Sequence, residues 1–167
     1  MKSTLDPDAG VVLRLRGVTP SDLEVFFEHQ REPAANALAA FPARARDEFY
    51  AHWTEAMTDP ETVLRTIVFQ GRIAGNIVSW RALEERCVGY WLGQAFWGKG
   101  IATRALRALC AEVEERPLYA YVALHNAGSR RVLEKCDFAM LGKIRVAPAA
   151  DSEPQIEEYV LRLDVRG

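Results

Sequence analysis

The sequence predicts a single α/β (α+β) domain with a central mixed, mostly antiparallel twisted sheet of about seven strands, flanked by about four helices. The length of 167 residues suits one domain. Hydrophobic residues make up 49% of the chain and charged residues 26%, which is typical of a protein that buries one core. Strand patterns first follow one another as hairpins, and a strand–helix–strand unit comes later, which favours a mixed sheet. We expect residues 1–10 to be a flexible lead-in and residues 11–167 to form the domain.

The first 60 residues carry one strand signal and two helix signals. Residues 11–16 alternate apolar and basic side chains, as a half-buried strand does. Thr19-Pro20-Ser21-Asp22 supplies an N-cap, a proline at the first helical position and an acid at the third, so we expect a helix to about residue 30. The alanine-rich residues 31–43 contain two prolines and predict a loop or short helical turns. Large apolar residues at four-residue spacing then predict a second helix that ends at Asp59-Pro60.

The rest of the chain changes from strands to alternating strands and helices. Two β-branched runs, residues 63–69 and 73–80, flank Gln70-Gly71-Arg72 and predict a hairpin. The remaining expected elements, in chain order, are a polar turn at Glu84-Glu85-Arg86, a strand over 87–92, a helix over 98–114, a strand over 117–122, a helix from Asn126 through Lys135, a strand over 138–141, a loop over 146–154 and a strand over 156–163.

Composition excludes several classes of protein. The net charge of −2 argues against a dedicated nucleic-acid binder, because such domains usually carry a basic excess. The three cysteines, Cys87, Cys110 and Cys136, form no CxxC pair and fit reduced thiols better than a disulfide framework. The first ten residues lack the apolar region of a signal peptide, and no apolar run is long enough to span a bilayer. We therefore expect a soluble, cytoplasmic protein with no metal site, no membrane partner and no nucleic-acid partner.

The most informative segment is residues 89–103, which read as a strand, a short loop with two glycines and the start of an amphipathic helix. The first N–H groups of a helix lack internal partners, and the helix dipole there favours negative charge. Gly98 and Gly100 would let a phosphate approach the backbone closely. The segment therefore predicts an anion site, although taken alone it is also compatible with a turn that binds nothing. Ile101-Ala102 follows Gly100, so neither a P-loop nor a dinucleotide fingerprint fits.

Two motifs resemble those of GNAT acetyltransferases. The first is Trp97-Gly98-Lys99-Gly100-Ile101-Ala102, with Trp97 in the Gln/Arg place of the family's acetyl-CoA signature, as in the RimJ/RimL-like branch. The second is Asn126-x-x-Ser129-x-x-Val132-Leu133-Glu134-Lys135-Cys136-Asp137-Phe138, with Asp137 in place of that branch's glycine. The two motifs stand in the family's order and spacing, and the expected elements match the family's fold over residues 11–163.

The resemblance implies an acetyl-CoA site and no metal. The backbone from Gly98 through Thr103 is expected to hold the CoA pyrophosphate, and the edge of Tyr90-Trp91-Leu92 to pair with the pantetheine arm. Asn126 is expected to bond the pantetheine or the acceptor, or to act only as an N-cap. The implied cofactor-binding residues are Tyr90, Trp91, Leu92, Trp97, Gly98, Lys99, Gly100, Ile101, Ala102, Thr103 and Asn126.

The implied activity is direct transfer of the acetyl group of acetyl-CoA to a primary amine in a ternary complex. The acceptor is a protein N-terminus or a small-molecule amine, and the protein is expected to be a monomer or a homodimer. Two alternatives stay open: a non-catalytic acyl-CoA sensor, and a transferase that uses another acyl-CoA. The basic residues Lys99, Arg104, Arg130 and Arg131 either meet the cofactor's phosphates or form solvated helix faces.

The catalytic groups are less clear from the sequence than the cofactor loop. Many GNAT enzymes place a tyrosine seven residues after the asparagine, where this chain has Leu133. By resemblance, Ser129 replaces that tyrosine as the acid, with Asn126 beside it; the alternative is that Ser129 only bonds the helix backbone. No residue stands out as the base. The histidines and carboxylates considered are His29, His52, His125, Glu84, Glu85, Glu157 and Glu158, and the aromatic residues considered for the acceptor pocket are Phe41, Phe49, Trp53, Trp80 and Trp91.

Overall fold

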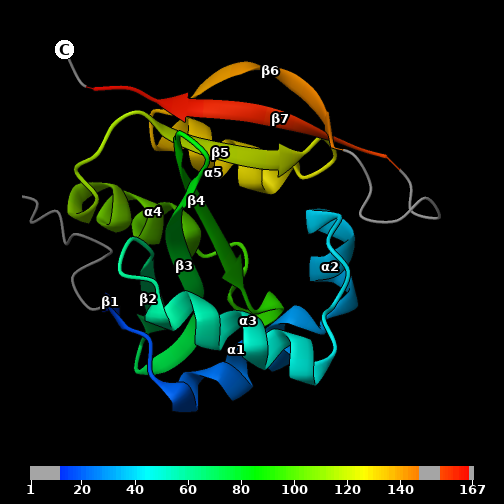
Figure 1. The fold of residues 1–167 in the computed structure, drawn as a ribbon, viewed down its shortest axis with the longest axis vertical. Coiled ribbons are helices and arrows are strands. Elements are labelled where there is room, and N and C mark those ends of the chain that lie inside the picture. Colours follow the sequence, from blue (N-terminus) through cyan, green and yellow to red (C-terminus); the bar gives the residue numbers. More distant parts are fainter. Residues whose placement is uncertain (1–11, 147–154, 166–167) are drawn as a thin grey trace, which may run out of the picture.

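The structure, a computed structural model, describes residues 12–146 and 155–165. These residues form seven strands and five α-helices (Figure 1). The strands are β1 (Leu13–Gly17), β2 (Val63–Phe69), β3 (Arg72–Ala82), β4 (Glu85–Leu92), β5 (Leu118–Ala123), β6 (Ala139–Val146) and β7 (Ile156–Leu163). The helices are α1 (Leu23–Gln30), α2 (Pro33–Ala39), α3 (Arg46–Thr58), α4 (Ile101–Glu112) and α5 (Ala127–Lys135), and short 3₁₀ turns precede α1 and α4.

The strands form one mixed sheet in the order β1-β2-β3-β4-β5-β7-β6. Five of the neighbouring pairs are antiparallel, and the central pair, β4 with β5, is parallel. A parallel pair needs a crossover connection, and α4 supplies it between β4 and β5. The predicted fold class, a mixed and mostly antiparallel sheet flanked by helices, is confirmed.

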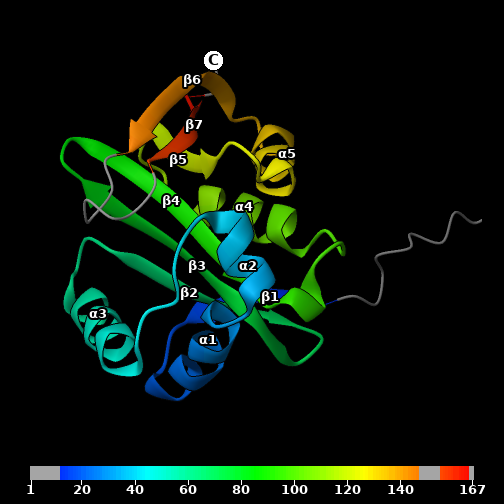
Figure 2. The same ribbon diagram turned by 90° about the vertical axis from the view of Figure 1, so that its right-hand side faces the viewer.

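Apolar side chains leave both faces of the sheet and form two cores. On β3, Ile77 belongs to the larger core beneath α4 and α5, whereas its neighbour Val78 packs against the smaller core of α1 and α3. Successive residues of a strand point to opposite faces, so this alternation places the two pairs of helices on opposite sides of the sheet. Figure 2 shows the same arrangement, with α1 and α3 on one side and α4 and α5 on the other. The sheet is therefore the middle layer of the molecule.

A buried aspartate fixes the start of α1 to the sheet. Asp22 is 2% exposed and accepts hydrogen bonds from Arg16 Nη1 and Nη2 at 2.6 and 2.8 Å. The hydroxyl of Thr66 on β2 donates to it at 2.7 Å, and the backbone N–H of Thr19 at 2.9 Å. The acid expected in the first turn of a helix is present, but its main contacts are with β1 and β2.

The structure differs from the predicted elements at several boundaries. Of the two alternatives for residues 31–43, a loop or short helical turns, the helical one is confirmed: residues 33–39 form the helix α2, which has Pro33 in its first turn and ends at Ala40 in a left-handed conformation. Glu85, expected in a turn, belongs to β4, and α4 begins at Ile101 rather than at Gly98. The predicted lead-in and nearly all of the predicted loop over 146–154 lie outside the described residues. None of the helices in the described part of the chain is long and apolar enough to cross a membrane.

Candidate active site

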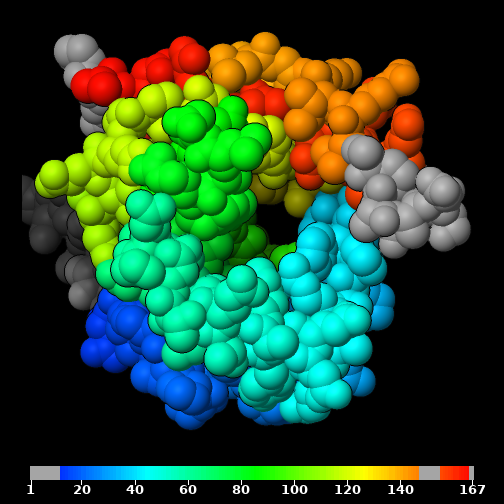
Figure 3. Space-filling model, in the orientation of Figure 1, coloured from blue at the N-terminus to red at the C-terminus, as the bar shows by residue number. Residues whose placement is uncertain are grey.

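The parallel strands β4 and β5 pair only where they begin. Their register covers Arg86 with Leu118 and Cys87 with Tyr119, and beyond these pairs the two strands diverge. A cavity of about 500 Å³ lies at this fork and is lined by β4, the loop after it and the first turns of α4 and α5, with α2 closing one side. Figure 3 shows a deep hollow on the face that carries α3, between the green β3–β4 region, the cyan α2 region and the yellow β5 region. The fork therefore opens the middle of the sheet to a ligand.

The loop before α4 offers bare backbone to this cavity. Gly98 and Gly100 have left-handed φ angles of +71° and +72°, which other residues adopt only with strain, and both line the cavity. A Cβ built on either glycine meets no atom within 4 Å, so a side chain there would stand in the cavity. Ile101 and Ala102 bury their side chains in the core and can offer only their N–H groups. Because the first N–H groups of α4 lack partners within the helix, the loop fits an anion.

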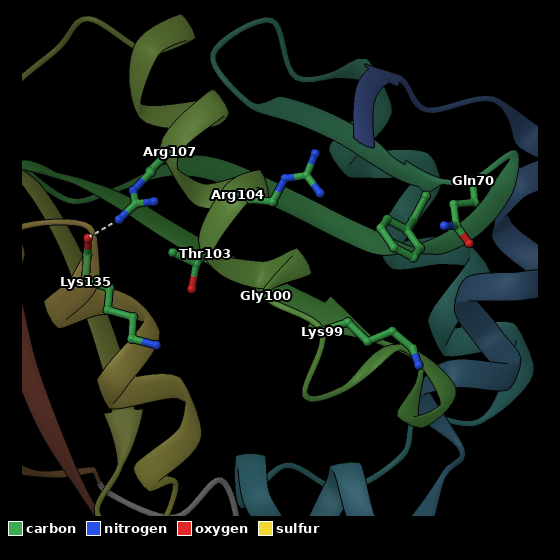
Figure 4. A pocket seen from close by; sticks show the side chains of 8 residues that line it. Gln70, Lys99, Gly100, Thr103, Arg104, Arg107 and Lys135 are labelled. Carbon is green, nitrogen blue, oxygen red and sulfur yellow. Dashed lines mark hydrogen bonds between the residues drawn. The ribbon is translucent and has the colours of Figure 1, made fainter. Parts of the chain in front are cut away.

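A second hollow, of about 610 Å³, adjoins the fork cavity and carries four basic side chains. The residues that line this cationic hollow are Phe69, Gln70, Lys99, Gly100, Thr103, Arg104, Arg107 and Lys135. In Figure 4, Arg104 and Arg107 extend from α4, Lys135 from the end of α5 and Lys99 from the glycine loop. Arg107 is held in place because its Nη2 donates to the carbonyl oxygen of Lys135 at 2.9 Å. No carboxylate lines the hollow, so its field favours an anion.

The indole rings of Trp91 and Trp97 fasten the walls of the fork. Trp97 donates from Nε1 to the carbonyl oxygen of Leu92 at 3.1 Å, which ties the glycine loop to the end of β4. Trp91 donates from Nε1 to the carbonyl oxygen of His29 on α1 at 3.2 Å, and its ring meets Phe41 edge to face at 6.4 Å. Both residues line the cavity, and both also hold neighbouring segments in position.

Asn126, Ser129 and Tyr90 meet on the opposite wall of the cavity. The side-chain oxygen of Asn126 accepts from the backbone N–H of Ser129 at 3.1 Å, so Asn126 is the N-cap of α5. Among the described residues, the hydroxyl of Ser129 does not bond the helix backbone; it lies 2.6 Å from the hydroxyl of Tyr90. The structure therefore joins two residues that are 39 positions apart and lie on different elements.

The position in α5 at which the resemblance led us to look for a tyrosine holds a core leucine. Leu133 is 1% exposed and packs in the larger core, so it offers nothing to the cavity. The only tyrosine hydroxyl among the residues lining the fork cavity comes from β4 instead, through Tyr90. Burial raises the pKa of Tyr90 to about 12, although its hydrogen bond with Ser129 opposes the shift. Sequence reasoning gave Tyr90 only a backbone role, because strand alternation cannot show which helix its side chain meets.

The four glutamates considered as the base differ in burial and in their hydrogen-bond and ion-pair partners. On β7, Glu157 forms an ion pair with Arg145, whereas Glu158 is half-buried and burial raises the pKa of its carboxyl group. Glu158 lies opposite Ala123 at the end of β5 and Glu85 accepts a hydrogen bond from Tyr121, which places both carboxylates on the sheet face away from α4. Glu84, by contrast, is exposed at the β3–β4 turn. Of the two adjacent glutamates, Glu158 therefore faces inward and Glu157 faces solvent.

The three histidines occupy different environments. His29 is buried, and burial lowers its pKa; burial and the nearby Arg44 charge also lower the pKa of His52. His125 places Nε2 2.6 Å from the carbonyl oxygen of Ala37, which holds α2 against the end of β5. His125 therefore positions α2, one wall of the fork cavity.

The aromatic residues considered for the acceptor pocket divide between core and cavity. Phe49 and Trp53 are buried in the smaller core, where Trp53 lies 5.0 Å from Phe26. Trp91 lines the cavity and contacts the exposed Phe41. The ring of Trp80 lies over Gly89 on the neighbouring strand, where a Cβ would come within 3.1 Å of it. Only the pair of Phe41 and Trp91 is therefore placed at the fork.

One sequence profile, one relative and two solved structures that match this chain are all described as acetyltransferases. The sequence profile described as "Acetyltransferase (GNAT) domain" matches residues 13–139. The chain is 29% identical over 108 residues to the "Putative ribosomal N-acetyltransferase YdaF" of Bacillus subtilis (strain 168), a match that spans 60% of this chain and only 58% of that relative.

Two solved structures share the fold. RimL, a ribosomal-protein acetyltransferase in complex with coenzyme A, has a TM-score of 0.75 at 18% identity, over 92% of this chain and 94% of its own. Spermidine N-acetyltransferase from Vibrio cholerae, in complex with CoA and spermine, has a TM-score of 0.75 at 15% identity, over 89% of this chain and 94% of its own.

Proposed function

The chain belongs to the GNAT acetyltransferase family, and on that premise we propose that it transfers the acetyl group of acetyl-CoA directly to a primary amine, on a protein N-terminus or a small molecule. The observation that carries this proposal is the glycine loop at the fork. It combines bare backbone, the start of a helix and an adjoining cationic hollow, which together suit a ligand that carries several phosphates.

The residues of the fork would hold acetyl-CoA along its whole length. The N–H groups between Gly98 and Thr103 would bind the pyrophosphate, and the edge of β4 beyond the β4–β5 pairs would bind the pantetheine as an added strand does. The cationic hollow beside the loop, with Lys99 and Arg107, would take the phosphorylated adenosine end. When bound, acetyl-CoA supplies an acetyl group activated as a thioester. Structures of two proteins with this fold are complexes with CoA, which supports the assignment.

The acceptor amine would enter from the face that carries α1 and α3. An amine of this kind has a pKa of ~10.4 and must lose a proton before it attacks. Glu85 and the half-buried Glu158 lie on that face, and because neither lines the fork cavity, they would take up the proton through water. Ser129 lies on the other side of the fork, where the sulfur would leave, and is the proposed acid.

A covalent intermediate on the protein has no support from the cysteines. All three thiols are free, and burial raises the pKa of Cys87 and of Cys110 to about 11. A thiol with such a pKa is almost entirely protonated at neutral pH and is a poor nucleophile. None of the three cysteines lines the fork cavity. These facts favour direct transfer in a ternary complex.

An acceptor screen tests the proposal. Acetyl-CoA is incubated with the protein and with a panel of peptides with free N-termini and of small amines, and thiol release is followed. We expect release that depends on one class of acceptor, together with mass addition of one acetyl group to that acceptor. Tight CoA binding without acceptor-dependent thiol release across the panel would instead identify an acyl-CoA sensor.

A further inference from the structure

The side chain of Tyr90 has no role in the cofactor contacts described so far. Its backbone belongs to the edge of β4, but its ring lies on the opposite side of the sheet from Trp91 and packs beside the larger core. The ring carries its hydroxyl through that core to the first turn of α5. A buried hydroxyl must be paired, and within the part of the chain that the structure describes Tyr90 pairs only with Ser129.

Two hydrogen-bond arrangements are available to this pair. The Tyr90 hydroxyl lies 2.6 Å from Ser129 Oγ and 3.3 Å from the Ser129 carbonyl oxygen. In one arrangement Tyr90 donates to the carbonyl oxygen and Ser129 donates to Tyr90. In the other, Tyr90 donates to Ser129 Oγ, which leaves the Ser129 proton free to point into the cavity. A negative charge beside Ser129 would favour the second arrangement, because an O–H then points at the charge.

We propose that Tyr90 is a positioning residue that works through Ser129, and that the two hydroxyls form a relay that protonates the leaving thiolate. This inference rests on the proposed function. The nearby thiol of Cys136 is not part of the relay, since it donates to the Thr103 carbonyl oxygen in α4. The relay supplies from β4 what α5 lacks, where Leu133 occupies the place of a tyrosine.

The protons and electrons of the step balance without an additional reactant. The acceptor nitrogen forms its bond to the acetyl carbon, and the C–S bond breaks with its electron pair left on sulfur. Ser129 gives its hydroxyl proton to that sulfur, and Tyr90 gives its own proton to Ser129 Oγ. Water carries the proton lost by the amine and returns one to Tyr90. The sum is one amine proton exchanged for one thiol proton.

The energetic reason for a relay is the weakness of serine as an acid. A thiol has a pKa of ~8.5, so a lone serine hydroxyl, which is a much weaker acid, gives up its proton to a thiolate at a cost. A second hydroxyl that donates to Ser129 Oγ in the same step stabilises the charge that develops there. The pKa of about 12 that burial gives Tyr90 keeps it protonated at neutral pH and ready to donate.

A double-mutant cycle tests the relay. The variants are Tyr90→Phe, Ser129→Ala and the two together, with Tyr159→Phe as the matched control, because Tyr159 is also partly buried beside the larger core. We expect each single change at the pair to lower kcat roughly 10- to 100-fold, with the KM for acetyl-CoA and the Kd for CoA changed less than twofold. The double variant should be no slower than Ser129→Ala, because residues that act as one unit are not additive.

A proton inventory supplies a readout that packing alone would not change. Single turnovers are timed in mixtures of H₂O and D₂O with the wild-type protein and Tyr90→Phe. Two protons in transit give a curved plot for the wild-type protein, and the variant should give a straight one. The relay would be overturned if the kcat losses of the two single variants multiplied in the double variant, or if the wild-type protein and Tyr90→Phe gave the same plot of rate against D₂O fraction. Either result would leave the acetyltransferase assignment intact. A wild-type protein without acceptor-dependent turnover would overturn both.

Discussion

Gly100 combines a backbone requirement with a ligand requirement. Its φ of +72° lies in the left-handed region, and the residue lines both the fork cavity and the cationic hollow. Gly71, in the turn between β2 and β3, has nearly the same backbone angle, with φ at +75°, but lines neither hollow. The two glycines therefore separate the effect of strain from the effect of lost access.

Valine at Gly100 should abolish CoA binding while the protein still folds. The new side chain would stand where the phosphates approach the backbone, so we expect Kd for CoA to rise at least 100-fold. Strain at a left-handed position costs roughly 1–2 kcal/mol of stability. Gly71→Val should lose a similar amount of stability and keep its CoA affinity. Calorimetric titration measures the CoA affinity, and urea unfolding measures the stability. Equal CoA binding by both variants would refute the assignment of the phosphates to the glycine loop.

Asp22 should make stability depend on acid pH. Burial alone would raise its pKa, but the hydrogen bonds from Arg16, Thr19 and Thr66 outweigh burial and hold the pKa of Asp22 well below its usual value. A lowered pKa in the folded state contributes stability that is complete above the unfolded pKa of ~3.9 and is lost as the pH falls below it. We expect Asp22→Asn to lose about 1–3 kcal/mol at pH 7, since the buried amide cannot accept all the hydrogen bonds that Arg16, Thr19 and Thr66 donate to Asp22.

The control for Asp22 is Glu24→Gln, which removes an exposed partner of Arg46. Exposed pairs contribute little, so this variant should unfold close to the wild type. Urea unfolding between pH 3 and pH 7 makes the comparison. A wild-type stability curve that runs parallel to that of Asp22→Asn over this range would contradict the assignment.

Helix α4 and the end of α5 together make the cationic hollow, and neither element makes it alone. Arg104 and Arg107 lie one turn apart on α4, and Lys135 closes the hollow from α5. If the phosphorylated adenosine end of CoA occupies it, the 3′-phosphate is the group that adds charge there. Removing that phosphate then reports on the hollow without disturbing the glycine loop.

Neutralising the hollow should erase a preference for the 3′-phosphate. We expect the wild-type protein to bind CoA about tenfold more tightly than dephospho-CoA, which corresponds to about 1.4 kcal/mol. In Lys99→Gln/Arg107→Gln the two ligands should bind alike, and the wild-type preference should weaken as salt is added. Arg14→Gln, an exposed change on β1, should keep the preference. A double variant that still distinguishes the two ligands would place the phosphate elsewhere.

The elements that could be predicted from the sequence are those with a local cause. The glycine loop, the Asn126 cap and the hairpin of β2 and β3 each follow from a few adjacent residues. Helix α2 has only a partial local signal, the proline in its first turn, and its position also depends on the contact between Ala37 and His125, which are 88 positions apart. The pair of Tyr90 and Ser129 was likewise inaccessible, because it depends on how β4 faces α5. Most of the residues that line the fork cavity were therefore predictable, and their side-chain partners were not.

At the scale of the whole molecule, the sheet is two smaller sheets that meet at a narrow seam. β1 to β4 form one part and β5, β7 and β6 the other, and two residue pairs between β4 and β5 join them. The core beneath α4 spans both parts, with Ile77 on one side and Leu118 on the other. A ligand at the fork would contact both parts and so favour the state in which they are correctly placed.

CoA should therefore stabilise the protein against heat. A ligand at 100 times its Kd stabilises the folded state by about 2.7 kcal/mol, which for a domain of this size corresponds to a rise in Tm of roughly 5–10 °C. Differential scanning calorimetry with and without CoA measures the shift. Gly100→Val should show no shift at the same concentration. A wild-type Tm that does not respond to CoA would contradict binding at the fork.

The divergence of β4 and β5 also has a consequence for solubility. Most sheets have unpaired strand edges only at their outer strands, whereas in this one residues 88–92 of β4, in the middle of the sheet, also have no partner on β5. An unpaired strand edge is a template for a strand of another chain, and proteins usually protect such edges. The opening that would admit the proposed cosubstrate is thus also a place where a second molecule could add a strand. By occupying the gap, the cosubstrate would act as a guard against self-association as well as a reactant.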